Sequence, residues 1–405
     1  MLFDPTRHEP LGPAPWDEAR ARAAIAAIVR DAVGAYRPGR WWPPHPNDLG
    51  PGDDPTAPFT PLYFGAAGVV WALRHLRAVG AAPELALPDF DLDTLRADNR
   101  AWLRAQGDTD LGSYLMGDLG IELIAWGDDP SPGRADRLQA LIENLADHPA
   151  RELMWGAPGG LLAASLLHEY RPDPRWAALA RRLSTRLEEQ LHWSEAFGCH
   201  YWQQDLYGHR STYLDAVHGF VATAHGLIRS RHLLGAEAWA RWQARIVQTV
   251  ARTATVEGGL ANWRCELIEP AGRPPRWLMQ FCHGAPGFVI CLADLPTPEL
   301  DALLLAAGEA VWAAGPLAKG ANLCHGTAGN GCAFLALHRR TGDARWLQRA
   351  RAFAMHAIGQ SDAEAERLGR RRHSLWTGDP GLACYLWNCL RAQPGFPTLD
   401  RFYPV

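Results

Sequence analysis

The chain has 405 residues, of which 47% are hydrophobic and 21% charged, and 40 basic against 44 acidic residues give a formal net charge of -4. This balance is typical of a globular protein and argues against a general nucleic-acid binder, whose affinity depends on neutralising phosphates. No apolar run reaches the roughly 18–20 residues that span a bilayer, the first residues lack the layout of a signal peptide, and eight scattered cysteines do not suggest a disulfide framework, so we expect a cytoplasmic chain.

The elements expected along the chain are mostly amphipathic helices. Apolar residues recur at helical spacing in four stretches that predict helices: 17–36, 173–192, 236–256 and 343–359. Only 197–207 suggests strands, and the charged segment 361–373 is expected to be solvated. Proline-rich stretches at 41–61 and 394–405 predict extended arms that wrap the domain.

A two-glycine step, Gly-x-x-Gly followed by an apolar stretch, recurs seven times between these elements. The first glycines lie 52, 39, 63, 65, 42 and 52 residues apart, at positions 65, 117, 156, 219, 284, 326 and 378. One such step is weak evidence of a repeat, but seven copies that each open an apolar helix indicate one. The fourth copy has Ala222 where the others have their second glycine.

One amphipathic helix followed by one apolar helix, repeated seven times, predicts an all-α fold. Burying both kinds of helix requires an inner ring of apolar helices inside an outer ring of amphipathic ones, which is an α/α toroid. An open solenoid of helix pairs is the alternative. Uneven spacing with polar inserts favours the closed form, because inserts can lie on one rim. We therefore expect a single toroid domain over 1–405, with extended arms at 1–16 and 394–405.

Cysteine and histidine residues precede three of the glycine steps. Cys282 and His283 precede the fifth step, Cys324 and His325 the sixth, and His218 the fourth. Equivalent positions in successive repeats should meet on one rim, and thiolates with imidazoles are the usual ligands of zinc. If both His283 and His325 bound the metal, the site would be closed and structural; if one did, it would be open and catalytic.

These motifs resemble those of the lanthionine synthetase C-like family over nearly the whole chain. The sequences QFCHGAPG (280–287) and NLCHGTAGNG (322–331) are similar to the two zinc-ligand motifs of that family. ELMWGAPG (152–159) and HSLWTGDPG (373–381) are similar to its third and last repeats. The resemblance implies the double ring of seven and seven helices, and zinc-dependent addition of a thiol to dehydroamino acids.

The resemblance also assigns roles to particular residues. It implies Zn²⁺ bound by Cys282, Cys324 and His325, with the fourth position open to a substrate thiol. His283 would then lie beside the metal and contact the substrate. His218 matches the active-site histidine of the family, and we expect it to protonate the α-carbon after addition, because imidazole changes charge near neutral pH.

Three further residues are candidates for substrate contacts. The only lysine, Lys319, lies in LAKGANLCHG, which resembles the run of the glutathione-using members of the family, so it is expected to bind glutathione. Asp118 and Tyr213 fall near the same rim by their place in the repeats, with helix capping or turn hydrogen bonds as an equally good explanation.

Three functions are compatible with this site. The first is the addition of glutathione to dehydroalanine or dehydrobutyrine residues of proteins or peptides. The second is a cyclase that joins a peptide's own cysteine thiol to such residues in a precursor. The third is an adaptor that binds zinc and glutathione without turnover. A glycosidase would need paired carboxylates on the glycine steps, and a zinc prenyltransferase a carboxylate ligand and a partner chain, and neither is indicated.

Overall fold

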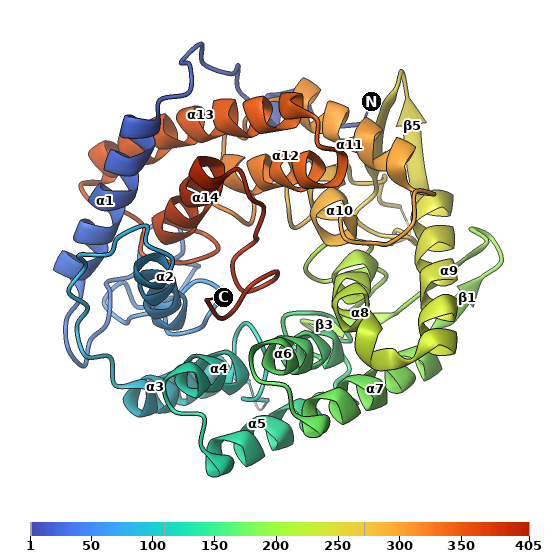
Figure 1. Ribbon diagram of the computed structural model, residues 1–405, viewed down its shortest axis with the longest axis horizontal. Helices are drawn as coiled ribbons and strands as arrows, with labels where there is room; N and C mark the ends of the chain where they lie inside the picture. The colour runs from blue at the N-terminus through green and yellow to red at the C-terminus, as the bar shows by residue number, and fades with distance from the viewer. Residues whose placement is uncertain (1, 109, 271, 405) are drawn as a thin grey trace.

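A computed structural model of the chain describes residues 2–108, 110–270 and 272–404. Within them the helices alternate between two concentric rings (Figure 1), which confirms the expected α/α toroid. The inner ring consists of α2 (Ala66–Ala78), α4 (Asp118–Asp128), α6 (Ala157–Tyr170), α8 (Phe220–Leu234), α10 (Ala285–Leu292), α12 (Thr327–Thr341) and α14 (Asp379–Arg391). The outer ring consists of α1 (Glu18–Ala35), α3 (Leu92–Ala105), α5 (Pro132–Asn144), α7 (Pro174–Glu189), α9 (Ala236–Thr253), α11 (Asp301–Ala314) and α13 (Ala344–Leu368).

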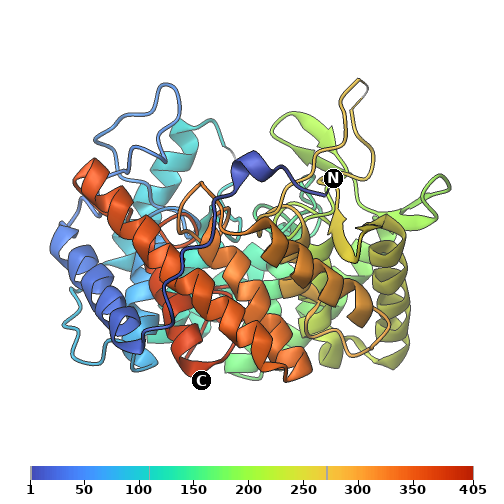
Figure 2. The same cartoon turned by 90° about the horizontal axis from the view of Figure 1, so that it is seen from above.

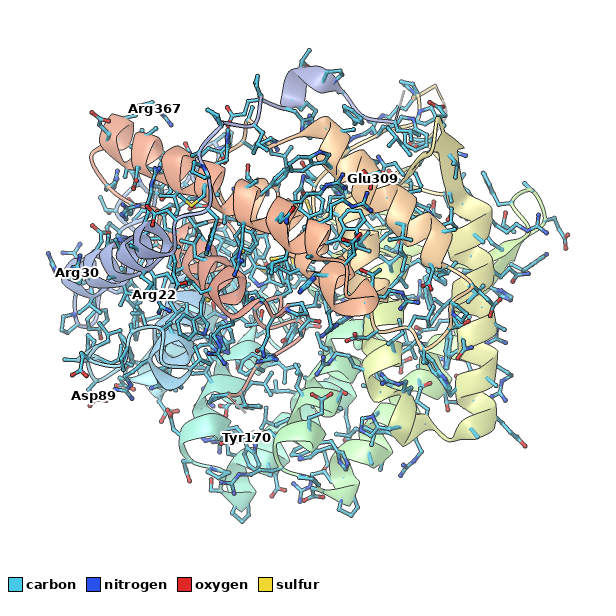
Figure 3. All side chains as sticks on the ribbon, turned by 45° about the horizontal axis from the view of Figure 1, so that its top comes forward. Arg22, Arg30, Asp89, Tyr170, Glu309 and Arg367 are labelled. Atoms are coloured by element: carbon cyan, nitrogen blue, oxygen red, sulfur yellow. The ribbon has the colours of Figure 1, made fainter. Side chains whose placement is uncertain are left out.

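The two rings differ in burial as the sequence pattern predicts. All residues of α10 are buried, whereas α3 buries only Leu95, Asn99 and Leu103. Charged side chains such as Arg30 and Arg367 lie at the periphery of the molecule (Figure 3). In the described part of the chain, no helix combines the length and apolar character needed to cross a bilayer.

Each glycine step caps an inner helix and ties it to the next repeat. Gly284 has a φ of +107°, and a Cβ at Gly287 would lie 2.2 Å from the Phe281 carbonyl oxygen, so side chains are excluded at both positions. At the fourth step, where Ala222 replaces the second glycine, Gly219 has the same extended backbone before α8 as Gly156 has before α6.

Backbone hydrogen bonds join six of the seven pairs of neighbouring steps, including the last step with the first. In each bond the N–H of one step donates to the C=O of the next: Tyr63 to Leu115 (3.0 Å), Leu115 to Met154 (3.2 Å), Leu153 to Val217 (3.2 Å), Cys282 to Cys324 (3.1 Å), Cys324 to Trp376 (2.8 Å) and Trp376 back to Tyr63 (3.0 Å). The last bond connects the seventh repeat to the first, and α14 packs against α1 behind it. This closure is the feature that an open solenoid lacks.

Three antiparallel hairpins occupy the two longest inserts, which precede the fourth and fifth steps. The described strands are β1 (His192–Ser194), β2 (Cys199–Tyr201), β3 (Gln204–Leu206), β4 (His209–Ser211), β5 (Ala254–Glu257) and β6 (Leu260–Trp263). Strands were expected at 197–207 alone, which contains β2 and β3, whereas β1, β4, β5 and β6 lie outside that stretch. Seen from above, hairpins and the N-terminal arm lie at one end of the ring axis and the C-terminus at the other (Figure 2).

The C-terminal arm and the charged segment at the end of α13 depart from the expectation. The C-terminal arm enters the ring instead of wrapping it (Figure 1): Phe396 stacks on Phe281 at 4.0 Å, and Trp376 Nε1 donates to Thr398 Oγ1 at 3.0 Å. The charged segment from residue 361 onward continues α13 to Leu368, and it is not fully solvated, since Arg372 is buried.

Candidate active site

Three of the predicted residues form a compact cluster of metal-binding atoms. One ligand atom each from Cys282, Cys324 and His325 lies within 4.8 Å of the other two. The backbone bond from Cys282 to Cys324 holds the fifth and sixth steps side by side, and Asn322 Oδ1 accepts the His325 N–H at 2.9 Å. The residues that immediately precede two adjacent helices are thus brought to one point.

Two neighbouring polar groups contact the cysteine sulfurs. Tyr63 donates its hydroxyl to Cys324 Sγ at 2.8 Å, and Gln280 Nε2 donates to Cys282 Sγ at 2.9 Å. Burial and the charge of Cys324 raise the pKa of Tyr63 well above its ordinary value of 10.0, so it remains a neutral donor. Neither contact was predicted from the sequence, although Tyr63 lies two residues before its glycine, as both cysteines do.

The donor set fits a zinc ion. The hydrogen bond with Cys324, together with burial, raises the pKa of Cys282 well above the ordinary range of a thiol. Two buried sulfurs in contact therefore do not both become thiolates unless a cation neutralises them. Two thiolates and one imidazole match zinc sites that keep one position open for a substrate.

His218 is held by a buried carboxylate from the preceding repeat. Glu152 Oε2 lies 2.9 Å from His218 Nδ1, and the same carboxylate accepts the N–H groups of Met154 and Trp155 at 2.9 and 2.6 Å. Burial disfavours the imidazolium, but the hydrogen bond and charge of Glu152, aided by Asp215, outweigh it and raise the pKa of His218 above 6.5. With Nδ1 engaged by Glu152, Nε2 is the nitrogen that remains to donate a proton.

His283 forms a second pair of the same design. Its Nδ1 lies 2.8 Å from Asp215 Oδ2, while Asp215 Oδ1 accepts the N–H groups of Val217 and His218 at 2.9 and 2.7 Å. Burial lowers the pKa of His283, but Asp215 more than compensates and raises it well above 6.5. The ring is therefore engaged by Asp215, and it is His325 that joins the two cysteines.

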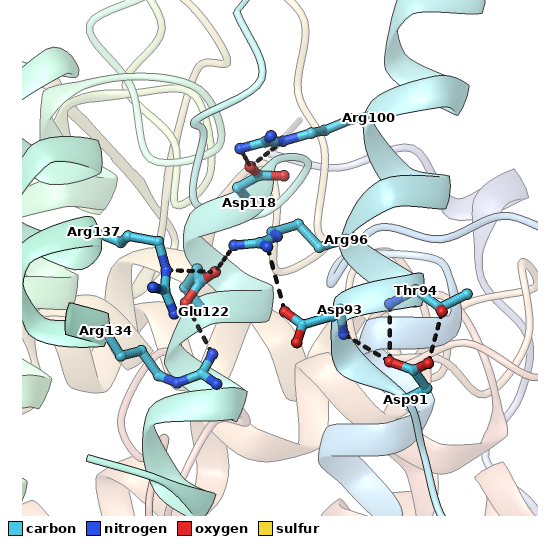
Figure 4. Close-up of polar contacts among 9 residues, drawn as sticks. All are labelled: Asp91, Asp93, Thr94, Arg96, Arg100, Asp118, Glu122, Arg134 and Arg137. Atoms are coloured by element: carbon cyan, nitrogen blue, oxygen red, sulfur yellow. Dashed lines mark hydrogen bonds and ion pairs between the residues drawn. The ribbon is translucent and has the colours of Figure 1, made fainter. Parts of the chain in front are cut away.

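The remaining candidates lie at different distances from this centre. The Tyr213 ring is 5.8 Å from both the His218 and His283 rings, so it bridges the two pairs. Asp118 instead forms an ion pair with Arg100 of α3 and is buried (Figure 4). Lys319 is exposed and precedes Gly320, whose carbonyl accepts the Thr327 N–H at the start of α12.

The two carboxylates share one position in the repeats, which is a sequence signal for them. Glu152 and Asp215 each occupy the fourth position before a first glycine, and Gln280 and Asn322 occupy the same position in the next two repeats. A polar residue at this place caps its own turn and reaches toward the following one, as the hydrogen bonds of Glu152 and Asp215 show.

Comparisons with known proteins agree with this architecture. Residues 126–399, more than half of the chain, match the sequence model described as lanthionine synthetase C-like protein. The chain is 32% identical over 193 residues to Glutathione S-transferase LANCL1 of Danio rerio, covering 45% of this chain and 46% of the relative. It is 36% identical over 128 residues to LanC-like protein GCL1 of Arabidopsis thaliana, covering 29% of this chain and 28% of the relative. The matched region thus spans less than half the length of either curated relative.

A solved structure named Nisin cyclase superposes with a TM-score of 0.57 over 92% of this chain and 94% of that one, at 14% identity, which shows a shared fold. The family match over most of the repeats and the shared double ring lead to one conclusion. This chain belongs to the lanthionine synthetase C-like family.

Proposed function

We propose that this chain catalyses the zinc-dependent addition of glutathione to dehydroalanine or dehydrobutyrine residues in proteins or peptides, forming a thioether. One observation supports this most strongly. The Cys282–Cys324–His325 cluster and the His218–Glu152 pair lie on adjoining glycine steps, with Tyr213 and His283 between them. A site for activating a thiol and a site for donating a proton therefore face one region.

The chemistry needs these two functions in sequence. A free thiol has a pKa of about 8.5, so little of it is thiolate at neutral pH. A zinc ion held by Cys282, Cys324 and His325 would supply the thiolate form of the incoming thiol. Sulfur bonds to the β-carbon, and the electron pair of the carbon–carbon double bond moves onto the neighbouring carbonyl as an enolate.

His218 completes the addition by protonating the α-carbon. Its Nε2–H is the proton donor, and Nδ1 remains hydrogen-bonded to Glu152 as the imidazolium becomes neutral. Glu152 keeps the ring in one orientation and favours its protonated form, because it raises the pKa of His218. His218 then regains its proton from solvent.

Two observations favour glutathione as the thiol. Lys319 is exposed beside the turn that precedes α12, where its ammonium can meet a carboxylate of glutathione as a point charge. One curated relative that this chain resembles carries the name Glutathione S-transferase. We place the activity in the cytoplasm, where glutathione and reduced thiols coexist.

The test uses a peptide that contains one dehydroalanine and one cysteine, incubated with glutathione and the purified protein. Addition of one glutathione, measured by mass spectrometry and faster than without protein, supports the proposal. Bound zinc should be about one per chain, and Cys324→Ala should lose both the metal and the rate enhancement. Ring closure leaves the mass unchanged while a free thiol disappears, and would favour the cyclase instead. Zinc and glutathione binding without any product would favour the adaptor.

A further inference from the structure

Tyr207 combines exposure with an unfavourable backbone. It occupies the first place of the two-residue turn between β3 and β4, where Leu206 pairs with His209. Its φ is +54° and that of Gly208 is +74°, the left-handed conformation that glycine and asparagine adopt most easily. The side chain is 67% exposed, although aromatic residues are usually buried. A strained and exposed aromatic residue in a turn calls for a functional explanation.

One end of Tyr207 is fixed on the turn that orients His218. Its hydroxyl accepts the indole N–H of Trp155 at 3.0 Å and lies 3.6 Å from Met154 Sδ. Trp155 and Met154 are also the residues whose backbone N–H groups donate to the Glu152 carboxylate. The Tyr207 ring stands edge-on to the His218 ring, with 6.4 Å between their centroids. The hydroxyl is thus anchored while a face of the ring is open beside the proton donor.

A second exposed apolar side chain belongs to the adjoining insert. Ile268 is 47% exposed, and its N–H donates to Thr212 Oγ1 at 2.9 Å, which attaches its loop to the base of the β3–β4 hairpin. The hairpin and this loop rise together at the end of the ring opposite the C-terminus (Figure 2). Ile268 is thus a second exposed apolar side chain, held beside the base of the hairpin that carries Tyr207.

We propose that Tyr207 is a binding residue for the acceptor polypeptide, which packs an apolar or aromatic side chain next to the dehydroamino acid against the exposed ring, with Ile268 extending this surface. When His218 Nε2 is about 3 Å from the reacting α-carbon, the neighbouring residue begins about 3.8 Å further along the backbone, within reach of a ring at this distance. Glutathione carries no such side chain and enters from the metal side. The inference rests on the proposed function and specifies its acceptor.

The experiment measures kcat/KM with glutathione for three acceptors: a dehydroalanine peptide flanked by phenylalanine, the same peptide flanked by glycine, and N-acetyldehydroalanine methyl ester. Wild type should prefer the phenylalanine-flanked peptide. Tyr207→Asn suits the positive φ and should keep Tm within about 2 °C of wild type. It should reduce the preference for phenylalanine over glycine about tenfold, whereas Tyr207→Phe should retain most of it.

Trp193→Ser provides the matched control, because Trp193 is an aromatic residue 44% exposed in the middle of β1, opposite His200 of β2, in a hairpin that packs against α9. The preference should be the same in this variant as in wild type. If Tyr207→Asn keeps the full preference, or slows all three acceptors equally, the acceptor role of Tyr207 is wrong while the proposed function stands. If wild type modifies none of the three, the proposed function itself fails.

Discussion

Two regions of the ring bury carboxylates, and they differ in the cation that faces each one. On α4, Asp118 pairs with Arg100, and Glu122 pairs with Arg96, Arg134 and Arg137 (Figure 4). On the third and fourth glycine steps, Glu152 and Asp215 instead face His218 and His283. All four carboxylates are nearly inaccessible to solvent.

This difference in partner separates carboxylates that stabilise the fold from carboxylates that can take part in proton transfer. Arginine keeps its charge at every accessible pH, so the α4 pairs are fixed and join the inner helix to α3 and α5. Histidine changes charge near neutral pH, so the pairs on the glycine steps can hold and release a proton. A buried carboxylate is therefore informative about function only once its partner is known.

Removing the histidine of the second kind of pair should have the largest effect. His218→Ala deletes the proposed proton donor, and kcat should fall by about 10²–10⁴, the usual contribution of general acid catalysis. Bound zinc should stay the same, because His218 is not in the cysteine cluster. Turnover by mass spectrometry and metal content are the two measurements. Unchanged turnover would show that another group donates the proton.

Breaking an arginine-paired carboxylate should act on stability instead. Glu122→Gln leaves three arginines without their shared anion, and it should lower the free energy of unfolding by about 1–3 kcal/mol. These arginines are partly exposed, which places the effect toward the lower end. Urea denaturation measures it, and kcat of the folded protein should match wild type. A kcat loss comparable to that of His218→Ala would erase the distinction between the two regions.

The pH dependence of Glu152→Gln tests whether the histidine pair is poised for proton transfer. Glu152 raises the pKa of His218, so its removal should move the alkaline limb of the kcat profile to lower pH and reduce kcat about tenfold at pH 7.5. Because the folded pKa is the raised one, the pair stabilises fully below about pH 6.5 and loses this contribution as pH rises through the folded value.

The stability of the same variant supplies an independent measurement. The difference in unfolding free energy between wild type and Glu152→Gln should be largest near pH 6 and should narrow toward pH 9. A difference independent of pH would mean that Glu152 acts only as the cap of its own turn, through Met154 and Trp155.

Interactions between residues close in the chain could be predicted from the sequence, and those between distant residues could not. The glycine steps predicted both rings, because helix starts and apolar periodicity are local properties of the chain. Cys324 and His325 could be predicted as metal ligands because they lie directly before the first glycine of a step. Glu152 and its partner are 66 residues apart, and only the closed ring brings them together. Asp118 shows the converse: its place beside a step suggested a substrate contact, whereas its arginine partner lies on the outer helix α3.

Lys319 differs from both groups of buried carboxylate pairs because it is exposed, and its substitution should have the smallest effect. Lys319 is exposed, and no ion pair of it occurs among the described residues. Its removal therefore leaves no buried charge without a partner and should not change the free energy of unfolding measurably. If it holds a glutathione carboxylate, Lys319→Ala should raise KM for glutathione roughly three- to fivefold, as an exposed charge contact allows, with kcat nearly constant. Lys319→Arg retains the charge but not the compact ammonium, so an intermediate KM would indicate that geometry contributes as well as charge.

Initial rates at varied glutathione concentration, repeated at high salt, measure this directly, because screening should narrow the difference in KM between wild type and Lys319→Ala. Identical KM values for all three proteins would remove Lys319 from the thiol site and leave the metal cluster and His218 unaffected.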